Sequence, residues 1–352
     1  MKIVHLIFSL NTGGAETMLV DIMNQQVMLG HHVSLIVINN SYSNELLSGI
    51  DAKVSIVLIK RPPSSLNPWY ILRLNWTLFR IKPDVIHLHN ASIGNLLFTS
   101  YVGFLTIHAL ETTLYPSNAS LSELFAISDA VKEDVEKRYP GKYCIQVIPN
   151  GIRLNDIQRR NNNNVLRDGI MRIIQVARLS AAIKGQDLLI DAINILKQRG
   201  LASINVDFIG TGSDELMLRD KVNKYALNDH IRFLGLRNRD YIYSHLKDYD
   251  LMCHPSRYEG FGLTVAEGIA AGLPVLVPDA DGPYEIIQQG KWGYTFKKGD
   301  AYSLADSLQD IYEHYHERIT SVVDNAYFHV KQNYSIESMV AQYIQEYNRF
   351  LK

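Results

Sequence analysis

One sequence pattern occurs at the start of the chain and again near its middle, and it constrains the fold more than any other feature of the sequence. Residues 1–24 contain MKIVHLIF followed by LVDIMN, and residues 171–194 contain MRIIQVAR followed by LIDAIN, at a constant offset of 170 residues. A buried strand, a loop and an amphipathic helix in this order open a doubly wound α/β domain. Because few residues are identical, we expect two domains of one architecture and not a strict repeat.

Further apolar runs of strand length follow both openings. They lie at 33–38, 53–59, 84–88, 103–107, 123–127 and 144–148, and again at 204–209, 230–234, 250–253 and 274–277. They are continuous and not alternating, which is typical of parallel strands covered on both faces. The fold class is therefore α/β, with two Rossmann-like, doubly wound domains facing each other across a cleft at the carboxyl ends of their strands.

The length of the chain and one polar tract set the domain boundaries. A chain of 352 residues suits two domains of moderate size. Residues 154–168 include four consecutive asparagines, Asn161 to Asn164, which cannot build a core. We predict an N-terminal domain at 1–155, a C-terminal domain at 169–334, and a helix at 335–352 that packs back on the N-terminal domain.

Composition excludes several classes of protein. A net charge of −1 gives no electrostatic reason to expect a nucleic-acid partner. Cys144 and Cys253 fit no disulfide framework or metal spacing, so a reducing cytoplasm is the simpler expectation. The longest apolar run, at 96–110, is too short to span a bilayer, so any membrane contact is expected to be peripheral.

The stretch at 254–274, HPSRYEGFGLTVAEGIAAGLP, carries two carboxylates, Glu259 and Glu267, on either side of a glycine-rich bend. Gly260, Phe261 and Gly262 precede a helix whose first amides can seat a phosphate. Glu267 lies in an otherwise small and apolar helix and needs a partner, such as the two hydroxyls of a ribose. A glycine-rich turn with Glu259 at the helix dipole and Glu267 paired to a cation explains the stretch equally well.

Two cations are expected at the same edge of the second sheet. Arg178 follows the strand that opens the second domain, and Lys184 comes six residues later at the start of a helix. Together with the amides of the glycine-rich bend they can surround a diphosphate. Taken alone, a salt-bridged Arg178 and a solvated Lys184 would be the simpler interpretation, and the nearby carboxylate stretch favours the functional one.

These motifs resemble those of the retaining glycosyltransferases of family GT4, which have the GT-B fold. The resemblance covers nearly the whole chain. The motifs are Gly13-Gly14-Ala15-Glu16, Ile148-Pro149-Asn150-Gly151, Arg178-Leu179-x4-Lys184-Gly185, Ile209-Gly210-Thr211-Gly212, and Pro255-Ser256-x2-Glu259-Gly260-Phe261-Gly262-Leu263-x3-Glu267.

The resemblance implies a role for each matching residue. Glu267 would bind the ribose of a nucleotide-sugar donor, Arg178 and Lys184 its diphosphate, and Glu259 the sugar hydroxyls. His108, at the end of a strand, matches the family's donor-facing histidine, although a lone histidine at a strand end is more often structural. The implied catalytic residues are His108, Arg178, Lys184 and Glu259. The implied donor-binding residues are Gly14, Arg178, Lys184, Gly212, Glu259, Gly260, Phe261, Gly262, Leu263 and Glu267.

The family also implies a reaction. A hexosyl or N-acetylhexosaminyl group would move, with retention of configuration, from a UDP-sugar more readily than a GDP-sugar to a hydroxyl of a saccharide or lipid-linked acceptor. The charges of Arg178 and Lys184 would replace a metal ion, so no metal or other cofactor is expected. Surface polysaccharide biosynthesis, in the cytoplasm or on the inner face of the cell membrane, is the corresponding setting.

Three other functions stay open from the sequence. Asp279-Ala280-Asp281 has the Asp-x-Asp pattern of metal-dependent GT-A glycosyltransferases, although its place after a strand and before Gly282-Pro283 suits a turn and helix cap. A GT-B sugar-nucleotide epimerase and a non-catalytic sugar-binding protein with two α/β lobes are the others. Turnover of a nucleotide sugar, with or without an acceptor, distinguishes them.

The segment at 60–82 mixes cations with aromatic and aliphatic residues around an expected helix. It contains Lys60, Arg61, Trp69, Trp76 and Arg80. Such a surface can rest on an anionic membrane and bring the site to a lipid-linked acceptor. An ordinary helix with both tryptophans packed on the sheet is the simpler expectation.

Overall fold

The structure is a computed structural model that describes residues 1–11, 13–160 and 165–351. The chain forms two compact units: an N-terminal unit of Met1–Gly151 with Ser335–Lys352, and a C-terminal unit of Ile152–Tyr334. The first boundary thus lies after Gly151 and not at residue 155, because the Ile152 amide already donates to the Tyr334 carbonyl of the second unit. The expected linker residues Asn161 to Asn164 lie outside the described residues.

Within the described residues, the N-terminal unit contains a seven-stranded parallel sheet in the order β3-β2-β1-β4-β5-β6-β7. Its strands are β1 Lys2–Ile7, β2 His32–Asn39, β3 Ser55–Arg61, β4 Val85–Leu88, β5 Gly103–Ile107, β6 Glu123–Ala126 and β7 Ile145–Val147. Its helices are α1 Gly14–Met28, α2 Asn44–Ser48, α3 Trp69–Ile81, α4 Asp129–Arg138 and α13 Ile336–Leu351, with short 3-10 helices at Ala91–Leu96 and Pro116–Ser120. The strand order reverses between β1 and β4, as in doubly wound folds.

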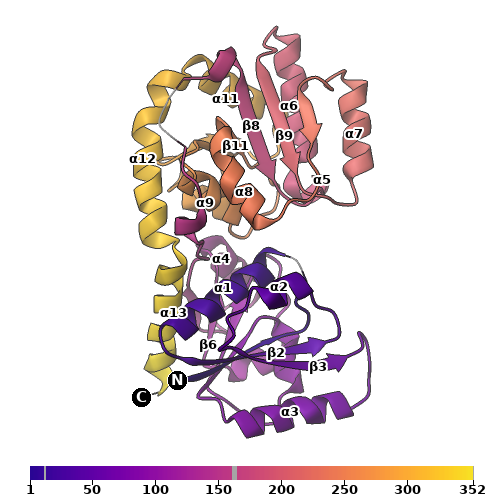
Figure 1. Ribbon diagram of the computed structural model, residues 1–352, viewed down its shortest axis with the longest axis vertical. Coiled ribbons are helices and arrows are strands. Elements are labelled where there is room, and N and C mark those ends of the chain that lie inside the picture. The colour runs from indigo at the N-terminus through magenta and orange to yellow at the C-terminus, as the bar shows by residue number, and fades with distance from the viewer. Residues whose placement is uncertain (12, 161–164, 352) are drawn as a thin grey trace. The chain divides into compact units, whose positions relative to one another are not determined.

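Helix α13, the last of the chain, completes the core of the N-terminal unit. It lies beside α1 (Figure 1). Its Met339, Tyr343 and Tyr347 side chains are fully buried in one cluster with Ile3 and Phe104 from the sheet. Gly151 permits this packing, because a Cβ atom there would lie only 2.6 Å from the Ser335 carbonyl oxygen. The predicted return of the C-terminal helix to the first domain is therefore present.

The C-terminal unit repeats the architecture with six described strands in the order β10-β9-β8-β11-β12-β13. The strands are β8 Met171–Val176, β9 Ile204–Ile209, β10 Ile231–Phe233, β11 Leu251–Cys253, β12 Val275–Pro278 and β13 Tyr294–Phe296. The helices are α5 Ala181–Lys184, α6 Gln186–Gln198, α7 Glu215–Lys224, α8 Arg239–His245, α9 Leu263–Ala270, α10 Asp281–Ile286, α11 Ala301–Glu313 and α12 Tyr315–Asn333, with 3-10 helices at Leu154–Asp156, Arg167–Gly169 and Leu246–Asp248. The order reverses between β8 and β11. Strand β13 was not among the expected strands, because its residues lie between Gly293 and Lys297 and belong to no apolar run of strand length.

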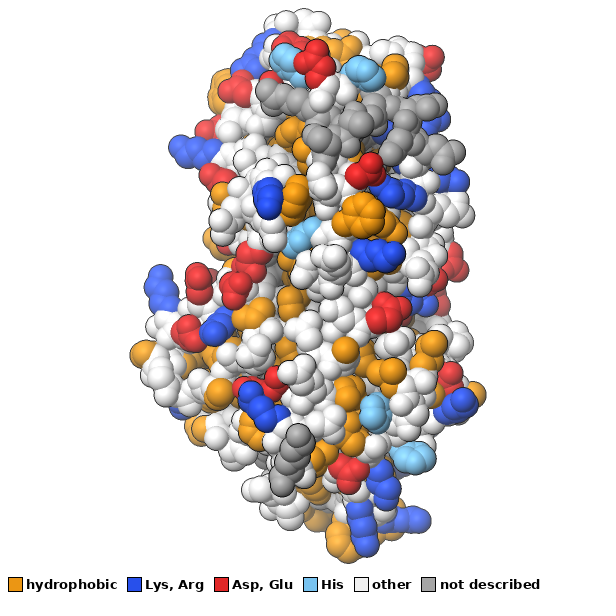
Figure 2. All heavy atoms as spheres, turned by 90° about the vertical axis from the view of Figure 1, so that its left-hand side faces the viewer, with side chains coloured by type: hydrophobic (Ala, Val, Ile, Leu, Met, Phe, Trp, Pro, Cys, Tyr) orange, Lys and Arg blue, Asp and Glu red, His pale blue; other side chains and the backbone are white. Residues whose placement is uncertain are grey.

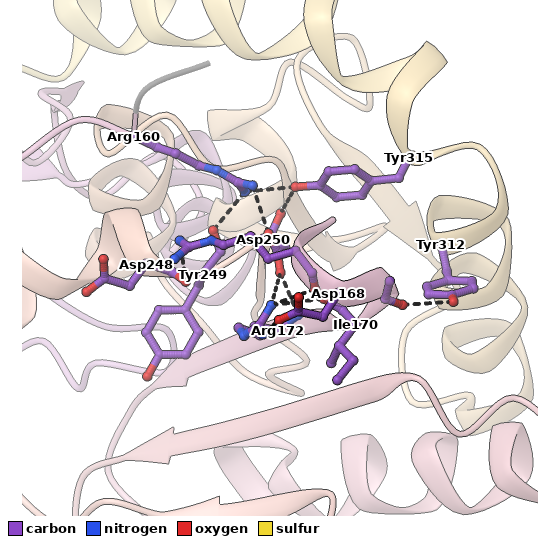
Figure 3. Close-up of polar contacts among 11 residues, drawn as sticks. Arg160, Asp168, Ile170, Arg172, Asp248, Tyr249, Asp250, Tyr312 and Tyr315 are labelled. Carbon is purple, nitrogen blue, oxygen red and sulfur yellow. Dashed lines mark hydrogen bonds and ion pairs between the residues drawn. The ribbon is translucent and has the colours of Figure 1, made fainter. Parts of the chain in front are cut away.

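A buried ion pair ties the chain entering the C-terminal unit to its sheet (Figure 3). The Arg160 guanidinium donates to the Asp250 carboxylate at 2.8 Å and to the Tyr315 hydroxyl at 2.9 Å. The side chains of Arg160 and Asp250 are only 11% and 1% exposed. The second carboxylate oxygen of Asp250 accepts from the Arg172 amide at 2.8 Å, so both oxygens are satisfied where strand β11 begins. The network thereby holds the segment at Arg160 against the start of strands β8 and β11, which are central in this sheet.

Removal of this arginine is expected to destabilise the C-terminal unit strongly. Arg160→Ala removes the 2.8 Å ion pair of the buried Asp250 carboxylate and leaves it only the longer 3.8 Å contact with the Arg172 guanidinium, which should cost about 3–5 kcal/mol. The matched control is Arg219→Ala, which removes an exposed arginine paired with Glu215 on α7 and should cost less than about 1 kcal/mol. Urea unfolding at pH 7 measures both. Equal losses in the two variants would contradict this account of the Arg160 network.

Helix α3 does not have the simpler arrangement expected from the sequence, in which both of its tryptophans pack on the sheet. Only Leu74 and Leu78 of this helix are buried. Trp69 and Trp76 are 53% and 58% exposed, so neither is buried against the sheet. Their rings instead face solvent next to arginines, with Arg73 over Trp69 and Arg80 over Trp76. None of the helices in the described residues has the length and apolar character needed to cross a bilayer.

Candidate active site

The predicted residues of the C-terminal unit gather at the carboxyl edge of its sheet. Strands β8 and β11 lie side by side at the point where the strand order reverses. Arg178 comes two residues after β8, and Glu259 lies in the loop after β11. Ligands of open α/β sheets bind at this position, because the loops diverge there and leave a crevice.

Arg178 is exposed, and its side chain has no partner among the described residues. Its backbone is held in place, because the fully buried Gln186 side chain donates to the Arg178 carbonyl at 3.0 Å. The guanidinium therefore extends from a fixed backbone and is available to an anionic ligand.

Lys184 and Glu259 form a direct ion pair between the Nζ and Oε2 atoms. Both side chains are largely buried, with 20% and 18% exposed. Burial by itself raises the pKa of the Glu259 carboxyl, but its contacts with His254 and Lys184 outweigh this effect and lower the pKa to about 2. The carboxylate is therefore ionised at any physiological pH and can only accept hydrogen bonds, as a partner for sugar hydroxyls would.

His254 holds Glu259 and is a residue that the sequence reasoning missed. Its ring is buried, and Nε2 lies 3.1 Å from Glu259 Oε2 and 3.0 Å from the Ser256 hydroxyl. Nδ1 lies 3.3 Å from the Thr264 hydroxyl in the first turn of α9. The sequence feature that could have identified His254 is its position directly before Pro255, at the end of a buried strand.

Arg257 is a second missed residue, and it positions the segment that carries Lys184. Its guanidinium makes a two-pronged ion pair with Asp187, at 2.7 and 2.9 Å, and donates to the Ala181 carbonyl at 2.7 Å. The contact of Gly185 with the same loop is tight, because a Cβ atom there would lie 2.0 Å from the Pro255 carbonyl oxygen. The loops after β8 and β11 are thus locked together.

The glycine-rich bend presents a run of unpaired backbone donors. In the described part of the chain, the N–H groups of residues 260–264 have no hydrogen-bond acceptor, whereas the Val265 amide begins the helical bonds of α9. Gly262 caps α9 with φ of +100°, a conformation that favours glycine. Phe261 is buried against Tyr334 and anchors the bend. The predicted phosphate seat rests on these donors together with the helix dipole.

Glu267 is half-buried on α9, and one of its oxygens is already engaged. The Tyr243 hydroxyl donates to Glu267 Oε1 at 2.9 Å, and the Arg239 guanidinium donates to the Tyr243 oxygen at 2.8 Å. Burial and the Glu267 charge raise the pKa of the Tyr243 hydroxyl, so it stays a donor. Both partners come from α8 and were not identified from the sequence, which gave no sign that this helix faces α9.

Gly212, the remaining predicted residue of this unit, lies on the loop after β9. Its Cα packs on the backbone of the loop after β8, because an added Cβ would lie 2.1 Å from the Leu179 carbonyl oxygen. The Leu179 amide in turn donates to the Thr211 carbonyl at 3.0 Å. Gly212 thereby brings its loop next to the segment that carries Arg178.

The N-terminal unit carries the other two predicted residues. Gly14 is exposed and begins α1 directly after the extended backbone of Gly13. His108 follows β5, and its Nε2 lies 3.2 Å from Nδ1 of the buried His89. Burial lowers the pKa of His108 to about 4, so its ring is neutral at pH 7. His108 Nδ1 is buried and has no partner in the described part of the chain.

Asp279 and Asp281, the residues of the Asp-x-Asp alternative, both have protein partners. Asp279 accepts from the Lys298 amide at 2.9 Å, and Asp281 pairs with the Lys298 ammonium at 2.6 Å. Asp281 also lies in the first turn of α10. The pair thus supports a turn and a short helix, as the sequence position suggested.

Within its described residues, the C-terminal unit therefore combines five amides without an acceptor, the available Arg178 guanidinium, a buried Lys184–Glu259 pair and the half-buried Glu267 carboxylate. Amides and cations bind phosphate oxygens, and carboxylates accept from sugar and ribose hydroxyls. The set matches an anionic, hydroxyl-rich ligand.

Comparisons with known proteins agree with this geometry. The structure of HepE from Anabaena in complex with UDP and glucose superposes with a TM-score of 0.80 at 21% identity, covering 98% of this chain and 99% of that one. The fold is therefore the GT-B fold of glycosyltransferases. Residues 156–327 match the family described as Glycosyl transferases group 1, and residues 12–156 match Glycosyltransferase Family 4. The chain belongs to this GT4-type family of glycosyltransferases.

Two relatives illustrate the similarity within the family. The putative colanic acid biosynthesis glycosyltransferase WcaL of Salmonella typhimurium is 29% identical over 53% of this chain. The phosphatidyl-myo-inositol mannosyltransferase of Mycobacterium leprae is 25% identical over 64% of it. The matches span 47% and 63% of these relatives' own lengths.

Proposed function

We propose that this protein transfers a hexosyl or N-acetylhexosaminyl group from a nucleotide-sugar donor, a UDP-sugar in preference to a GDP-sugar, to a hydroxyl of a saccharide or lipid-linked saccharide. The transfer retains the configuration of the sugar and uses no metal ion. The observation that carries the proposal is the row of amides at 260–264 that have no acceptor among the described residues, with the Glu259 carboxylate at one end and Glu267 on the helix that follows.

The donor binds in an orientation that these groups set. Glu267 accepts from the ribose hydroxyls, and its contact with Tyr243 fixes the direction of the carboxylate. The diphosphate lies on the amides of Gly262 and Leu263 with Arg178 beside it. Glu259, ionised and held by His254 and Lys184, accepts from hydroxyls of the sugar.

The protein's main catalytic task is to stabilise the leaving diphosphate. As the bond between the sugar and the phosphate breaks, negative charge develops on the departing oxygen, and fixed cations and amides lower the energy of that charge. Arg178, Lys184 and the helix amides supply this stabilisation in our proposal. The acceptor hydroxyl attacks the same face of the sugar, and the departing phosphate oxygen accepts its proton, so no strong protein nucleophile is required.

The names of the relatives support the proposed acceptor. One is described as a colanic acid biosynthesis glycosyltransferase and another as a phosphatidyl-myo-inositol mannosyltransferase. The first name contains a polysaccharide and the second a lipid with a hydroxylated head group, and from them we propose a saccharide or lipid-linked saccharide, in surface polysaccharide assembly, as the acceptor class.

Product analysis tests the reaction. The protein is incubated in EDTA with UDP-sugars and a panel of saccharide and lipid-linked acceptors, and the products are separated and their anomeric configuration determined by NMR. Formation of UDP together with a product that retains the donor configuration is expected. An epimerised nucleotide sugar without any acceptor product, or a product of inverted configuration, would contradict the proposal.

We also propose that α3 contacts a membrane surface that carries anionic phospholipids. Segment 60–82 contains five cations and no acidic residue. Large apolar side chains are exposed along it: Leu66 94%, Trp69 53%, Leu72 55%, Trp76 58% and Phe79 70%. At the lower end of the N-terminal unit, where Figure 1 places α3, Figure 2 shows Lys and Arg side chains gathered beside hydrophobic ones. This combination suits the interface of an anionic bilayer.

Vesicle binding tests the contact. The protein should bind vesicles of phosphatidylglycerol and phosphatidylcholine, and Arg73→Glu/Arg80→Glu should weaken binding at least about thirtyfold, because each cation near such a surface contributes about 1 kcal/mol. The control Lys137→Glu/Lys142→Glu changes the same number of charges on exposed positions of the same unit and should bind like the wild type. Absence of wild-type binding, or equal losses in both variants, would refute the contact.

A further inference from the structure

A cavity of about 610 Å³ lies in the N-terminal unit between helix α3 and the amino ends of strands β1, β2 and β3. Helix α3 lies beside β3 (Figure 1). The sheet wall of the cavity carries Lys2, His32, Ser34 and Ser55. Lys2 lies opposite His32 in the register of β1 with β2. Ser34 lies opposite Ser55 in the register of β2 with β3. Because residues two apart on a strand share a face, these four side chains belong to one face of the sheet.

The cavity exists because this face of the sheet is polar next to a helix. In a parallel sheet covered by helices, the strand residues that face a helix are usually apolar. Ser34 and Ser55 instead line the space beside α3 with small hydroxyl side chains. From α3 itself, only Leu74 and Leu78 are buried. The helix therefore packs on the sheet along a narrow stripe and leaves an open space beside it.

The charged groups of this cavity are cations. Lys2, Arg73 and Arg80 line it, and none of its described lining residues is Asp or Glu. Within the described part of the chain, none of the three cations forms a salt bridge. Arg73 donates one N–H to the Ile59 carbonyl at 3.2 Å, which leaves its other N–H groups available. Asp84 accepts from the Lys2 backbone amide at 2.7 Å and lies outside the cavity lining. Cations grouped without carboxylates suit an anionic ligand, and arginine suits phosphate in particular.

Hydroxyl groups complete the lining. They come from Ser34, Ser55 and Thr77. The Thr77 hydroxyl donates to the Arg73 carbonyl at 2.8 Å, so only its oxygen is left as an acceptor. The two serine hydroxyls have no protein partner within the described residues, and each can donate and accept. A ligand that carries a phosphate and hydroxyl groups of its own would match both kinds of lining group.

The outer surface of α3 indicates that this ligand is a lipid. Its exposed apolar side chains recur every three or four residues and form one stripe: Trp69, Leu72, Trp76 and Phe79. Trp76 also lines the cavity, and the Arg80 guanidinium lies over its ring, 4.8 Å from the centroid. A soluble phosphate compound would use the cations and not the stripe. An anionic phospholipid has a charged headgroup for the cavity and acyl chains for the stripe.

We propose that the cavity binds the headgroup of one anionic phospholipid. Lys2, Arg73 and Arg80 bind its phosphate, and the acyl chains lie along the exposed stripe of α3. Ser34 and Ser55 bind hydroxyl groups of the headgroup. The choice of a lipid rests on the proposed contact between α3 and an anionic membrane, and the cavity adds selectivity to that contact. Charge and apolar area alone would hold no single lipid, whereas the cavity holds one headgroup through defined hydrogen bonds.

Calorimetric titration of the full-length protein with dihexanoyl-phosphatidylglycerol, kept below the concentration at which this lipid forms micelles, tests the cavity. We expect saturable binding of one lipid per chain. Ser55→Phe fills the cavity without changing any charge. It should weaken binding at least about tenfold, because the headgroup loses hydrogen bonds to charged groups. Arg80→Gln removes one cation from an exposed position of the helix and should weaken binding to a similar extent.

Ser48→Phe is the matched control. It makes the same substitution at an exposed position of α2, which follows the carboxyl end of β2 and not its amino end. It should bind the lipid like the wild type. Urea unfolding shows whether each variant folds, and Arg80→Gln decides the question if Ser55→Phe does not. Undiminished binding in Arg80→Gln and in a folded Ser55→Phe, or equal losses in Ser55→Phe and Ser48→Phe, would overturn the proposal.

Other ligands identify the source of the phosphate. Inorganic phosphate and sn-glycerol 3-phosphate should bind at least about tenfold more weakly than the lipid, because they have no acyl chain to bury on the stripe of α3. If either binds as tightly as the lipid, the cavity is a site for a soluble phosphate and the lipid assignment is wrong. Dihexanoyl-phosphatidylcholine should also bind more weakly, because the lining cations repel its ammonium group. Equal binding of this zwitterionic lipid would overturn the selection of an anionic headgroup.

The vesicle experiment separates this inference from the proposed membrane contact. Binding of the wild type to vesicles, without saturable binding of the monomeric lipid, would contradict the headgroup site alone. Binding of the monomeric lipid without any binding to vesicles would contradict the membrane contact of α3 alone.

Discussion

Arg178→Ala is expected to lower kcat/KM for sugar transfer roughly one hundred- to one thousand-fold, the usual cost of removing one group that stabilises charge in the transition state. The side chain is exposed and has no partner in the described residues, so its loss leaves the fold intact. Arg178→Lys should recover part of the activity, because it keeps the charge but not the two-pronged geometry.

Steady-state kinetics with a UDP-sugar, together with urea unfolding of each variant, measures this effect. Lys247→Ala is the control, because Lys247 contacts Gln158 and lies before strand β11, at the opposite edge of the same sheet. It should leave kcat/KM unchanged. Similar activity of Arg178→Ala and the wild type would remove Arg178 from the catalytic set.

The N-terminal unit is expected to lose stability between pH 7 and pH 5. Burial lowers the pKa of His5 and His108 to about 4. Burial, and secondarily the charges of neighbouring histidines, lowers the pKa of His87 and His89 well below the usual value. Unfolded histidines titrate near pH 6.5, so the unfolded state binds more protons than the folded state below that pH. Stability is therefore complete above pH 6.5 and falls as the pH approaches 4.

The size of this loss of stability follows from the pKa of each histidine in the folded state, about 4, and in the unfolded state, near 6.5. For each of His5 and His108, a change from pH 7 to pH 5 should cost about 2 kcal/mol. Glu259 does not contribute in this range, because its stabilisation is lost only as the pH falls from 4.5 toward 2. Urea unfolding at both pH values measures the loss, and His108→Gln should make it smaller. An unfolding midpoint that does not change between pH 7 and pH 5 would contradict the burial of neutral histidines.

Much of the architecture could be predicted because parallel strands buried on both faces appear as continuous apolar runs. The repeated opening at residues 1 and 171 corresponds to strands β1 and β8, each central in its sheet. Strand β13 was missed because Tyr294–Phe296 follows a glycine and precedes Lys297 and Lys298, so that it belongs to no continuous apolar run. The exposure of Trp69 and Trp76 was also missed, since a sequence does not show which face of a helix lacks a neighbour.

The sequence could predict which loops carry the site, but not the contacts between the side chains of those loops. Strand order places Arg178 and Glu259 at one edge of a sheet, which the sequence could indicate. The pairing of Lys184 with Glu259 and the support from His254 depend on side-chain directions that only packing defines. The contact between His5 and His87 was hidden for the same reason, because these residues become neighbours only through the register of β1 with β4.

Calorimetric titration of UDP, GDP and ADP in excess EDTA tests the central claim, a metal-free nucleotide-sugar site in the C-terminal unit. UDP is expected to bind, and Glu267→Ala should weaken it by about tenfold or more, since a hydrogen bond to a charged group contributes about 1.5–3 kcal/mol. Glu215→Ala, which removes a carboxylate on α7, is the control and should bind UDP like the wild type. Failure of all three nucleotides to bind until a divalent cation is restored would contradict the account and point to Asp279 and Asp281.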